Sequence, residues 1–109
     1  MAKHEFGIMN TPPQTGVRYD EYEPRKYNCI SVNDEDIETL CVNTADIPVF
    51  YHTLDLPQYN LNYTGITLIP PQTATLFADR IGDNKNLQPL KALFEKAARD
   101  NKFVIHYGL

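Results

Sequence analysis

Apolar side chains recur every three or four positions near the carboxyl end of the chain, at Leu87, Leu90, Phe94 and Ala97. This spacing places them on one face of an α-helix. Pro89 fits only the first turn of a helix, so we expect the helix to begin near Asn86. Apolar and polar residues then alternate over 103–107, which predicts a closing strand.

Three earlier segments have the composition of strands, at 27–32, 49–54 and 62–69. The run of Asn and acidic residues at 33–36 predicts the start of a short helix, because Asn and Asp cap helices and acids favour the positive end of the helix dipole. Pro70 and Pro71 end the third strand and begin another helix, for which Gly82 is the expected carboxyl-terminal cap.

The amino-terminal extension, residues 1–25, has a different character. The apolar run 6–9 predicts a short edge strand, and residues 10–25 contain three prolines and a glycine, which predict a long loop. Loops of this length are uncommon in compact domains. We expect Tyr19 and Tyr22 to hold the loop against the rest of the protein.

Element order and length indicate one α+β domain, residues 1–109, with an extension at 1–25 and a core at 26–109. The βαββαβ order over 27–107 resembles that of ferredoxin-like folds, which implies an antiparallel sheet with helices on one face. Segments 65–71 and 103–108 are similar to stretches of small uncharacterised bacterial proteins. That second resemblance implies no activity and no catalytic residue.

A ferredoxin-like arrangement would place the closing strand at one edge of the sheet and 49–54 at the other. Alternation along the strands then divides their side chains between two faces. The face toward the helices would carry Ile30, Val32, Ile66, Leu68, Phe103 and Ile105. The other face would carry Tyr27, Cys29, Tyr63, Gly65, Thr67 and His106. Segment 49–54 leaves it open whether His52 points inward, with Tyr51 pointing outward.

The second face is rich in Tyr, Thr and His, which are typical of interfaces and ligand grooves. The candidate binding or interface residues are therefore Tyr27, Tyr51, Tyr63, Thr67 and His106. Three uses of this face remain open. It could bind a partner, most simply in a homodimer. It could line a small-molecule pocket, or the amino-terminal extension could cover it.

Composition restricts the partners. The chain has a net charge of −4 and its Lys and Arg residues are dispersed. Phosphate backbones and anionic membrane surfaces require clustered basic residues, so we expect neither nucleic acid nor a membrane as a partner. No apolar stretch follows the amino terminus, so we expect a cytoplasmic protein without a secretory signal. Cys29 and Cys41 have no metal-binding spacing and are expected to be half-buried.

No motif for catalysis, a cofactor or a metal is present. His52 and Asp55 would point to opposite sides of a strand, so they do not form an acid–base pair. His52 and His106 would lie on opposite edges, ~14 Å apart, too far to share a metal ion. His4 is expected near a mobile end. We therefore expect no catalytic residue, no metal site and no cofactor, and the protein is more consistent with binding than with catalysis.

Three functions remain possible. The favoured one is a non-catalytic interaction module that associates with itself or another protein through the Tyr-rich face. The second is a small ligand-binding protein or cofactor-free enzyme with a pocket between sheet and helices, lined by His106, Tyr63 and Tyr51. The third is an acidic inhibitor or immunity-type protein, for which acids at 34–38 or 20–23 would attract a basic partner.

Overall fold

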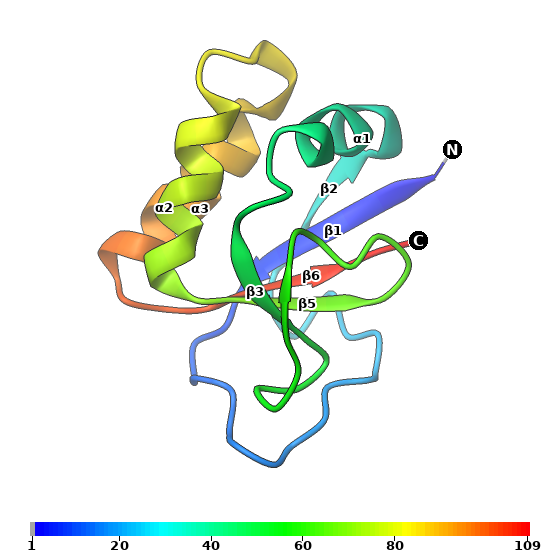
Figure 1. Ribbon diagram of the computed structural model, residues 1–109, viewed down its shortest axis with the longest axis vertical. Helices are drawn as coiled ribbons and strands as arrows, with labels where there is room; N and C mark the ends of the chain where they lie inside the picture. Colours follow the sequence, from blue (N-terminus) through cyan, green and yellow to red (C-terminus); the bar gives the residue numbers. More distant parts are fainter. Residues whose placement is uncertain (1) are drawn as a thin grey trace.

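The computed structural model describes residues 2–109 and confirms the predicted α+β class (Figure 1). Its six antiparallel strands have the order β2–β1–β6–β5–β3–β4. They are β1 (Lys3–Ile8), β2 (Ile30–Asn33), β3 (Pro48–Tyr51), β4 (Pro57–Tyr59), β5 (Ile66–Ile69) and β6 (Val104–Tyr107). The helices are α1 (Asp34–Val42), α2 (Pro71–Ile81) and α3 (Gln88–Arg99), with a short 3₁₀ turn, η1 (Lys85–Leu87), before α3. None of the helices formed by residues 2–109 has the length and apolar character that crossing a membrane requires.

The helices begin and end where the sequence predicts. Pro71 occupies the first turn of α2, where a missing N–H costs no hydrogen bond. Gly82 follows α2 with a φ of +54°, a conformation that glycine adopts without strain. In α1 three acids occupy the first turn, although the Asn33 side chain makes no capping hydrogen bond.

The strand order differs from the ferredoxin-like expectation. Strand β1 is not at an edge: it pairs with β2 on one side and with β6 on the other. The closing strand β6 is therefore central, between β1 and β5. Strand β2 becomes an edge, and β4, which was not predicted, forms the opposite edge. The expected order failed because the apolar amino-terminal run supplies a sixth, internal strand.

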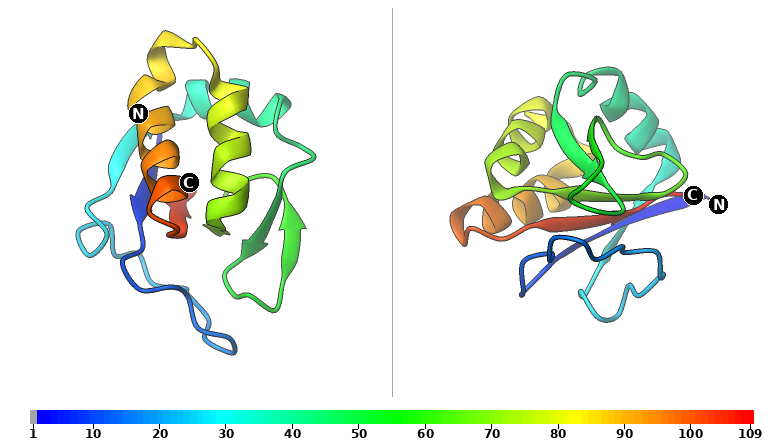
Figure 2. Two further views of the ribbon diagram at one scale, coloured as in Figure 1. Left: turned by 90° about the vertical axis from the view of Figure 1, so that its left-hand side faces the viewer. Right: turned by 60° about the horizontal axis from the view of Figure 1, so that its bottom comes forward.

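Both faces of the sheet are covered. The helices cover one face over a large buried cluster that includes Phe6, Val49 and Val104. The loop between β1 and β2, residues 9–29 and called here the leader loop, covers the other face (Figure 2). Beneath it lies a second cluster, formed by Met9, Ile66, Leu68, Ile105 and Tyr107. The protein thus has two apolar layers, one on each side of the sheet.

The predicted alternation within β5 and β6 is correct, but its assignment to the two sides is inverted. Ile66, Leu68 and Ile105 belong to the cluster under the leader loop. Thr67 and His106 lie opposite each other on the helix side, where each is fully buried. Alternation along a strand identifies which residues share a face, but it does not identify the face that the helices cover.

The leader loop contacts the sheet at Gly7, a position where β1 has no side chain. Gly7 lies under the end of the loop, and a Cβ atom at this position would come within 2.6 Å of the Tyr27 carbonyl oxygen. At a second contact, the Tyr19 N–H donates to the His52 carbonyl oxygen at 2.7 Å. His52 itself has a φ of +61°, which is uncommon for a residue other than glycine and is held by these contacts.

We predict that Gly7→Val displaces the end of the leader loop. The new side chain would overlap backbone atoms of Tyr27, which cannot move without the loop, and overpacking of this kind costs ~1–3 kcal/mol. A lower Tm and faster proteolysis within residues 10–28 would be measured. Gly16→Asn is the control, because Gly16 has nothing within 4 Å and Asn tolerates its positive φ. A Gly7→Val protein as stable and protease-resistant as wild type would contradict the prediction.

Candidate functional site

A chain of buried polar side chains crosses the sheet on its helix side. The His4 Nε2 atom lies 3.0 Å from Asp34 Oδ1, and His4 Nδ1 lies 2.9 Å from His106 Nε2. His106 Nδ1 in turn lies 2.9 Å from the Thr67 hydroxyl. Tyr63 donates its hydroxyl proton to Asp34 Oδ1 at the outer end. The central position of β1 makes this chain possible, because it brings His4 next to the closing strand.

The donors and acceptors of this chain are consistent with one direction of hydrogen-bond donation, from Thr67 to Asp34. The Asn62 N–H donates to the Thr67 hydroxyl oxygen at 2.8 Å, which leaves the Thr67 proton to bond His106 Nδ1. His106 then donates from Nε2 to His4 Nδ1, and His4 donates from Nε2 to the Asp34 carboxylate. We assign the tautomers from this pattern. Every ring nitrogen is satisfied with both imidazoles neutral.

The electrostatics agree with this assignment. Burial, with a smaller effect of His4, lowers the pKa of His106 well below its usual value of 6.5. The hydrogen bonds from Tyr63 and then His4 lower the pKa of Asp34. The same bond to Asp34 raises the pKa of Tyr63 to about 12. These shifts favour an ionised carboxylate at the outer end of the chain and a neutral His106 inside it.

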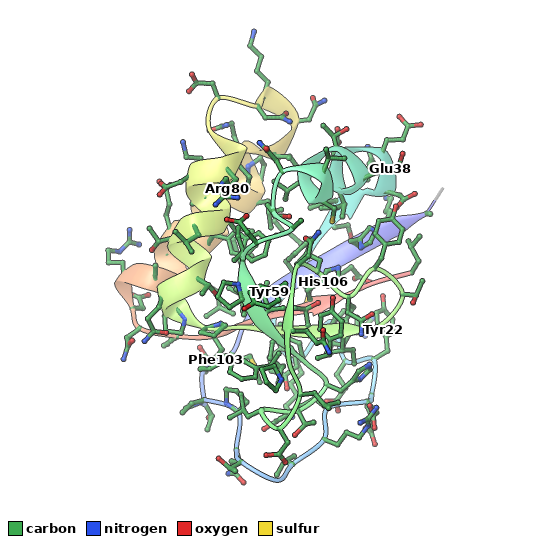
Figure 3. The ribbon with its side chains drawn as sticks, viewed as in Figure 1. Tyr22, Glu38, Tyr59, Arg80, Phe103 and His106 are labelled. Atoms are coloured by element: carbon green, nitrogen blue, oxygen red, sulfur yellow. The ribbon has the colours of Figure 1, made fainter. Side chains whose placement is uncertain are left out.

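The two histidines are closed to substrates. His4 and His106 are both 0% exposed, and Figure 3 shows His106 within the sheet. Only Asp34 and Tyr63, at the outer end of the chain, are partly exposed. General acid–base catalysis needs a group within hydrogen-bond reach of the substrate, and the imidazoles do not offer one. The arrangement instead fixes how β1, β5 and β6 meet.

Cavities are present on the opposite side of the sheet. Two adjoining cavities, of about 300 Å³ and about 280 Å³, lie along the leader loop and share Tyr19 and Tyr27. The first is lined by residues from both ends of the loop. The second lies between residues 18–23 and strand β6, where Ile105 and Tyr107 form its wall. Together they form what we call the leader cleft.

Tyr107 is the unusual residue of the leader cleft. It is 3% exposed, and its hydroxyl is the one buried side-chain polar atom within residues 2–109 that has no hydrogen-bond partner. Burial raises its pKa, while the nearby backbone of Glu23 lowers it. A backbone N–H could only donate to the phenol oxygen, so the phenol proton still lacks an acceptor. Buried unsatisfied groups of this kind cost free energy and call for an explanation.

The leader loop is fastened beside the second cavity by His52. His52 Nδ1 lies 2.8 Å from Asp20 Oδ1 and 3.1 Å from the Tyr19 carbonyl oxygen. Arg18 Nε also donates to Asp20, at 2.7 Å. As expected, His52 is not paired with Asp55, and the carboxylate that it contacts is Asp20. His52 thus acts as a link between the loop and strand β3, with its ring partly exposed.

Strand β2 forms a free edge of the sheet, at the opposite end from β4. The Asp34 N–H donates to the Ala2 carbonyl oxygen, so Ile30 and Val32 also direct their backbone groups toward β1. The backbone groups of Ser31 and Asn33 therefore point outward. A groove of about 150 Å³ runs alongside, between β2 and the start of α3. This edge could accept an added strand.

The five predicted site residues do not share one open face. Thr67 and His106 are fully buried, and Tyr63 lies near them at the end of the polar chain. Tyr51 packs on the same side and donates its hydroxyl proton to the Tyr59 carbonyl oxygen. Tyr27 alone lies on the other side of the sheet, where it is part of the leader loop and lines the cleft. The expectation of an open Tyr-rich sheet face is wrong, because helices cover one side and the loop the other.

Sequence reasoning missed His4, Asp34 and Tyr107. The expectation that His4 lies near a mobile end is wrong, since it is fully buried in β1. The alternation of His4 and Phe6 was a usable signal, because it continues the strand pattern toward the amino terminus. The partnership of Asp34 with His4 had no such signal, since the residues are separated by 30 positions.

The structure also shows where the two cysteines and the His52–His106 pair lie. Cys29 and Cys41 are half-buried on opposite sides of the sheet, and burial raises their thiol pKa values to about 12 and about 11. His106 lies in the central strand β6, and His52 directly follows β3, two strands away, so the two histidines are not at opposite edges of the sheet as expected. In the part of the chain that the structure describes, no three His, Cys, Asp or Glu side chains are placed to bind a metal ion.

Fold and site together define an antiparallel α+β protein with a sealed histidine chain on one side of its sheet and a cleft on the other. No family model, curated protein or solved structure matches this chain.

We predict that stability falls as the pH decreases from about 7 to about 5, since His106 stays neutral when folded but takes up a proton when unfolded. One such proton contributes at most about 1.4 kcal/mol per pH unit. The slope is measured by denaturant unfolding at several pH values, and His106→Gln should reduce it. NMR supplies a second readout: the His106 imidazole of the wild type should not titrate over this range. Titration near pH 6.5 would contradict the prediction.

Proposed function

We propose that this protein is a non-catalytic binding protein that holds a small molecule in the leader cleft. The observation that carries the proposal is the buried, unpaired hydroxyl of Tyr107 at the wall of the second cavity. A ligand that accepts a hydrogen bond from Tyr107 would remove this unfavourable feature. The site thus pairs a polar group with aromatic walls, which is the usual composition of a ligand pocket.

The location differs from the pocket expected between sheet and helices. On the helix side, residues such as Phe77 and Phe94 are fully buried in a continuous cluster. The leader side is held mainly by Tyr side chains and by the links at His52 and Gly7, so it can open without disturbing that cluster. Binding clefts are commonly built from such loops on a rigid sheet. The cleft volumes, near the lower end of the roughly 300–1,000 Å³ typical of ligand pockets, suit a small metabolite.

The sharpest test is Tyr107→Phe. Because the lost hydroxyl is unsatisfied in the free protein, this variant should be as stable as wild type or more stable, by up to ~1–3 kcal/mol. A panel of amino acids, amines, organic acids and nucleosides is then screened by two-dimensional amide NMR. At least one compound should shift the signals of Tyr27, Ile105 and Tyr107, and Tyr107→Phe should weaken its binding.

The proposal fails if no compound of the panel shifts these signals, or if Tyr107→Phe destabilises the free protein strongly. Strong destabilisation would mean that the hydroxyl has a structural partner. Tyr51→Phe is the matched control: it removes a hydroxyl on the other side of the sheet and should leave binding unchanged.

A second candidate function is association with another chain through strand β2. Its support is the outward-facing backbone of Ser31 and Asn33 beside the groove near α3. Two copies of β2 can pair antiparallel about Val32, so that Ser31 of each copy bonds Asn33 of the other. Four hydrogen bonds would then join the sheets of a homodimer.

Light scattering tests this association on wild type and on Ser31→Pro. The Ser31 N–H points away from β1, so proline should leave the fold intact while removing a donor from the free edge. We expect a dimeric wild type and a monomeric variant with an unchanged circular dichroism spectrum. A monomeric wild type, or a dimer that persists in Ser31→Pro, would rule out self-association through β2.

A further inference from the structure

We propose that the ligand of the leader cleft is a small organic ammonium compound that also carries a hydrogen-bond acceptor. This inference rests on the proposed function and specifies its chemistry. It joins three independent features of the second cavity: an excess of carboxylates, the aromatic surface of its Tyr residues, and the unpaired hydroxyl of Tyr107.

The charge of the cavity favours a cation. Asp20, Glu21 and Glu23 line it, against a single basic residue, Arg18. Arg18 is already paired with Asp20, and Lys26, which lines only the other cavity, is paired with Glu23 at 3.7 Å. Within residues 2–109, no ion pair involves Glu21. A positively charged ligand would therefore meet a site with a net negative charge.

The aromatic residues favour an organic cation over a metal ion. Tyr27 already receives an ammonium group: the Lys26 Nζ atom lies 5.4 Å from the centre of its ring. Lys26 lines the first cavity and not the second, while Tyr27 lines both. The ring is thus available from the second cavity, where Tyr19 and Tyr107 add further aromatic surface. Ring faces attract ammonium groups, and most strongly when water is excluded.

Tyr107 specifies the rest of the ligand. Its phenol proton needs an acceptor, which an ammonium group cannot supply, so a cation alone would leave the hydroxyl unpaired. A hydroxyl or carbonyl oxygen a few bonds from the ammonium would accept this proton. Because leader residues cover the hydroxyl, the loop must shift to admit the ligand. At Tyr19 and Asp20 the loop is held by the backbone and side chain of one residue, His52, so a shift needs only these contacts to break there.

The test compares three probes of similar size: choline, its neutral carbon isostere dimethylbutanol, and tetramethylammonium. Choline has both features, the isostere lacks the charge, and tetramethylammonium lacks the acceptor. Amide NMR titration should show the tightest binding for choline. The isostere should bind at least about fivefold more weakly, because it loses the cation–π and carboxylate interactions. Tetramethylammonium should also bind about fivefold more weakly than choline, because it lacks the acceptor for one hydrogen bond.

Two variants connect these differences to the residues. Tyr107→Phe should reduce choline binding to the level of tetramethylammonium and leave tetramethylammonium unaffected. Glu21→Gln should weaken both cations and leave the isostere unchanged. Glu38→Gln is the matched control, since Glu38 is an exposed acid on α1, on the helix side of the sheet (Figure 3). Its replacement removes the same charge without touching the cleft.

The outcomes separate the two proposals. If the isostere binds as tightly as choline, or if Glu21→Gln has no more effect than Glu38→Gln, the cationic ligand is excluded while the cleft remains a binding site. If none of the three probes binds but a neutral or anionic compound from the wider panel shifts the signal of Tyr107, the ammonium inference is also overturned. If nothing shifts the cleft signals, both proposals fail.

Discussion

The contact between His4 and His106 joins residues that are 102 positions apart, and the arrangement of the sheet depends on it. These two rings can bond only if the first and last strands are neighbours, which makes β1 and β6 the centre of the sheet. Both rings are fully buried, so each nitrogen must find a partner inside the protein. Asp34 and Thr67 supply the two ends of the chain. A shift of one residue between β1 and β6 would move one ring to the other face and leave its polar atoms unsatisfied.

The central position of β1 also determines how the opposite side of the sheet is covered. The chain leaves β1 at one end and must return to begin β2, and the leader loop makes this connection across the second apolar cluster. Gly7 lets the returning segment approach the strand, and His52 fastens the middle of the loop. The result is a sheet with a well-packed helix side and a leader side that is held by fewer contacts. A cleft is found on the second of these sides because loops pack less completely than helices.

Buried polar groups are hydrogen-bonded on the helix side of the sheet, whereas one of them lacks a partner on the leader side. On the helix side, the hydrogen bonds of the histidine chain are complete, and the chain stabilises one register. On the leader side, the Tyr107 hydroxyl is buried without an acceptor, although phenylalanine would fill the same space at no such cost. An unsatisfied group in an otherwise satisfied structure is the feature that a bound ligand explains most directly. The proposed ligand site therefore lies where the free protein leaves a buried hydrogen-bond donor unsatisfied.

Local patterns in the sequence are enough to predict the helices and several strands, because apolar periodicity, proline positions and Gly82 act over a few residues. They also predict which residues of β5 and β6 share a face. Three features are visible only in the folded protein: β1 is internal, helices cover the side with Thr67 and His106, and Tyr107 lies unpaired under the leader loop. These features depend on contacts between residues far apart in the chain. Local patterns do not encode such contacts, since alternation is the same whichever strand lies alongside and whichever layer covers it.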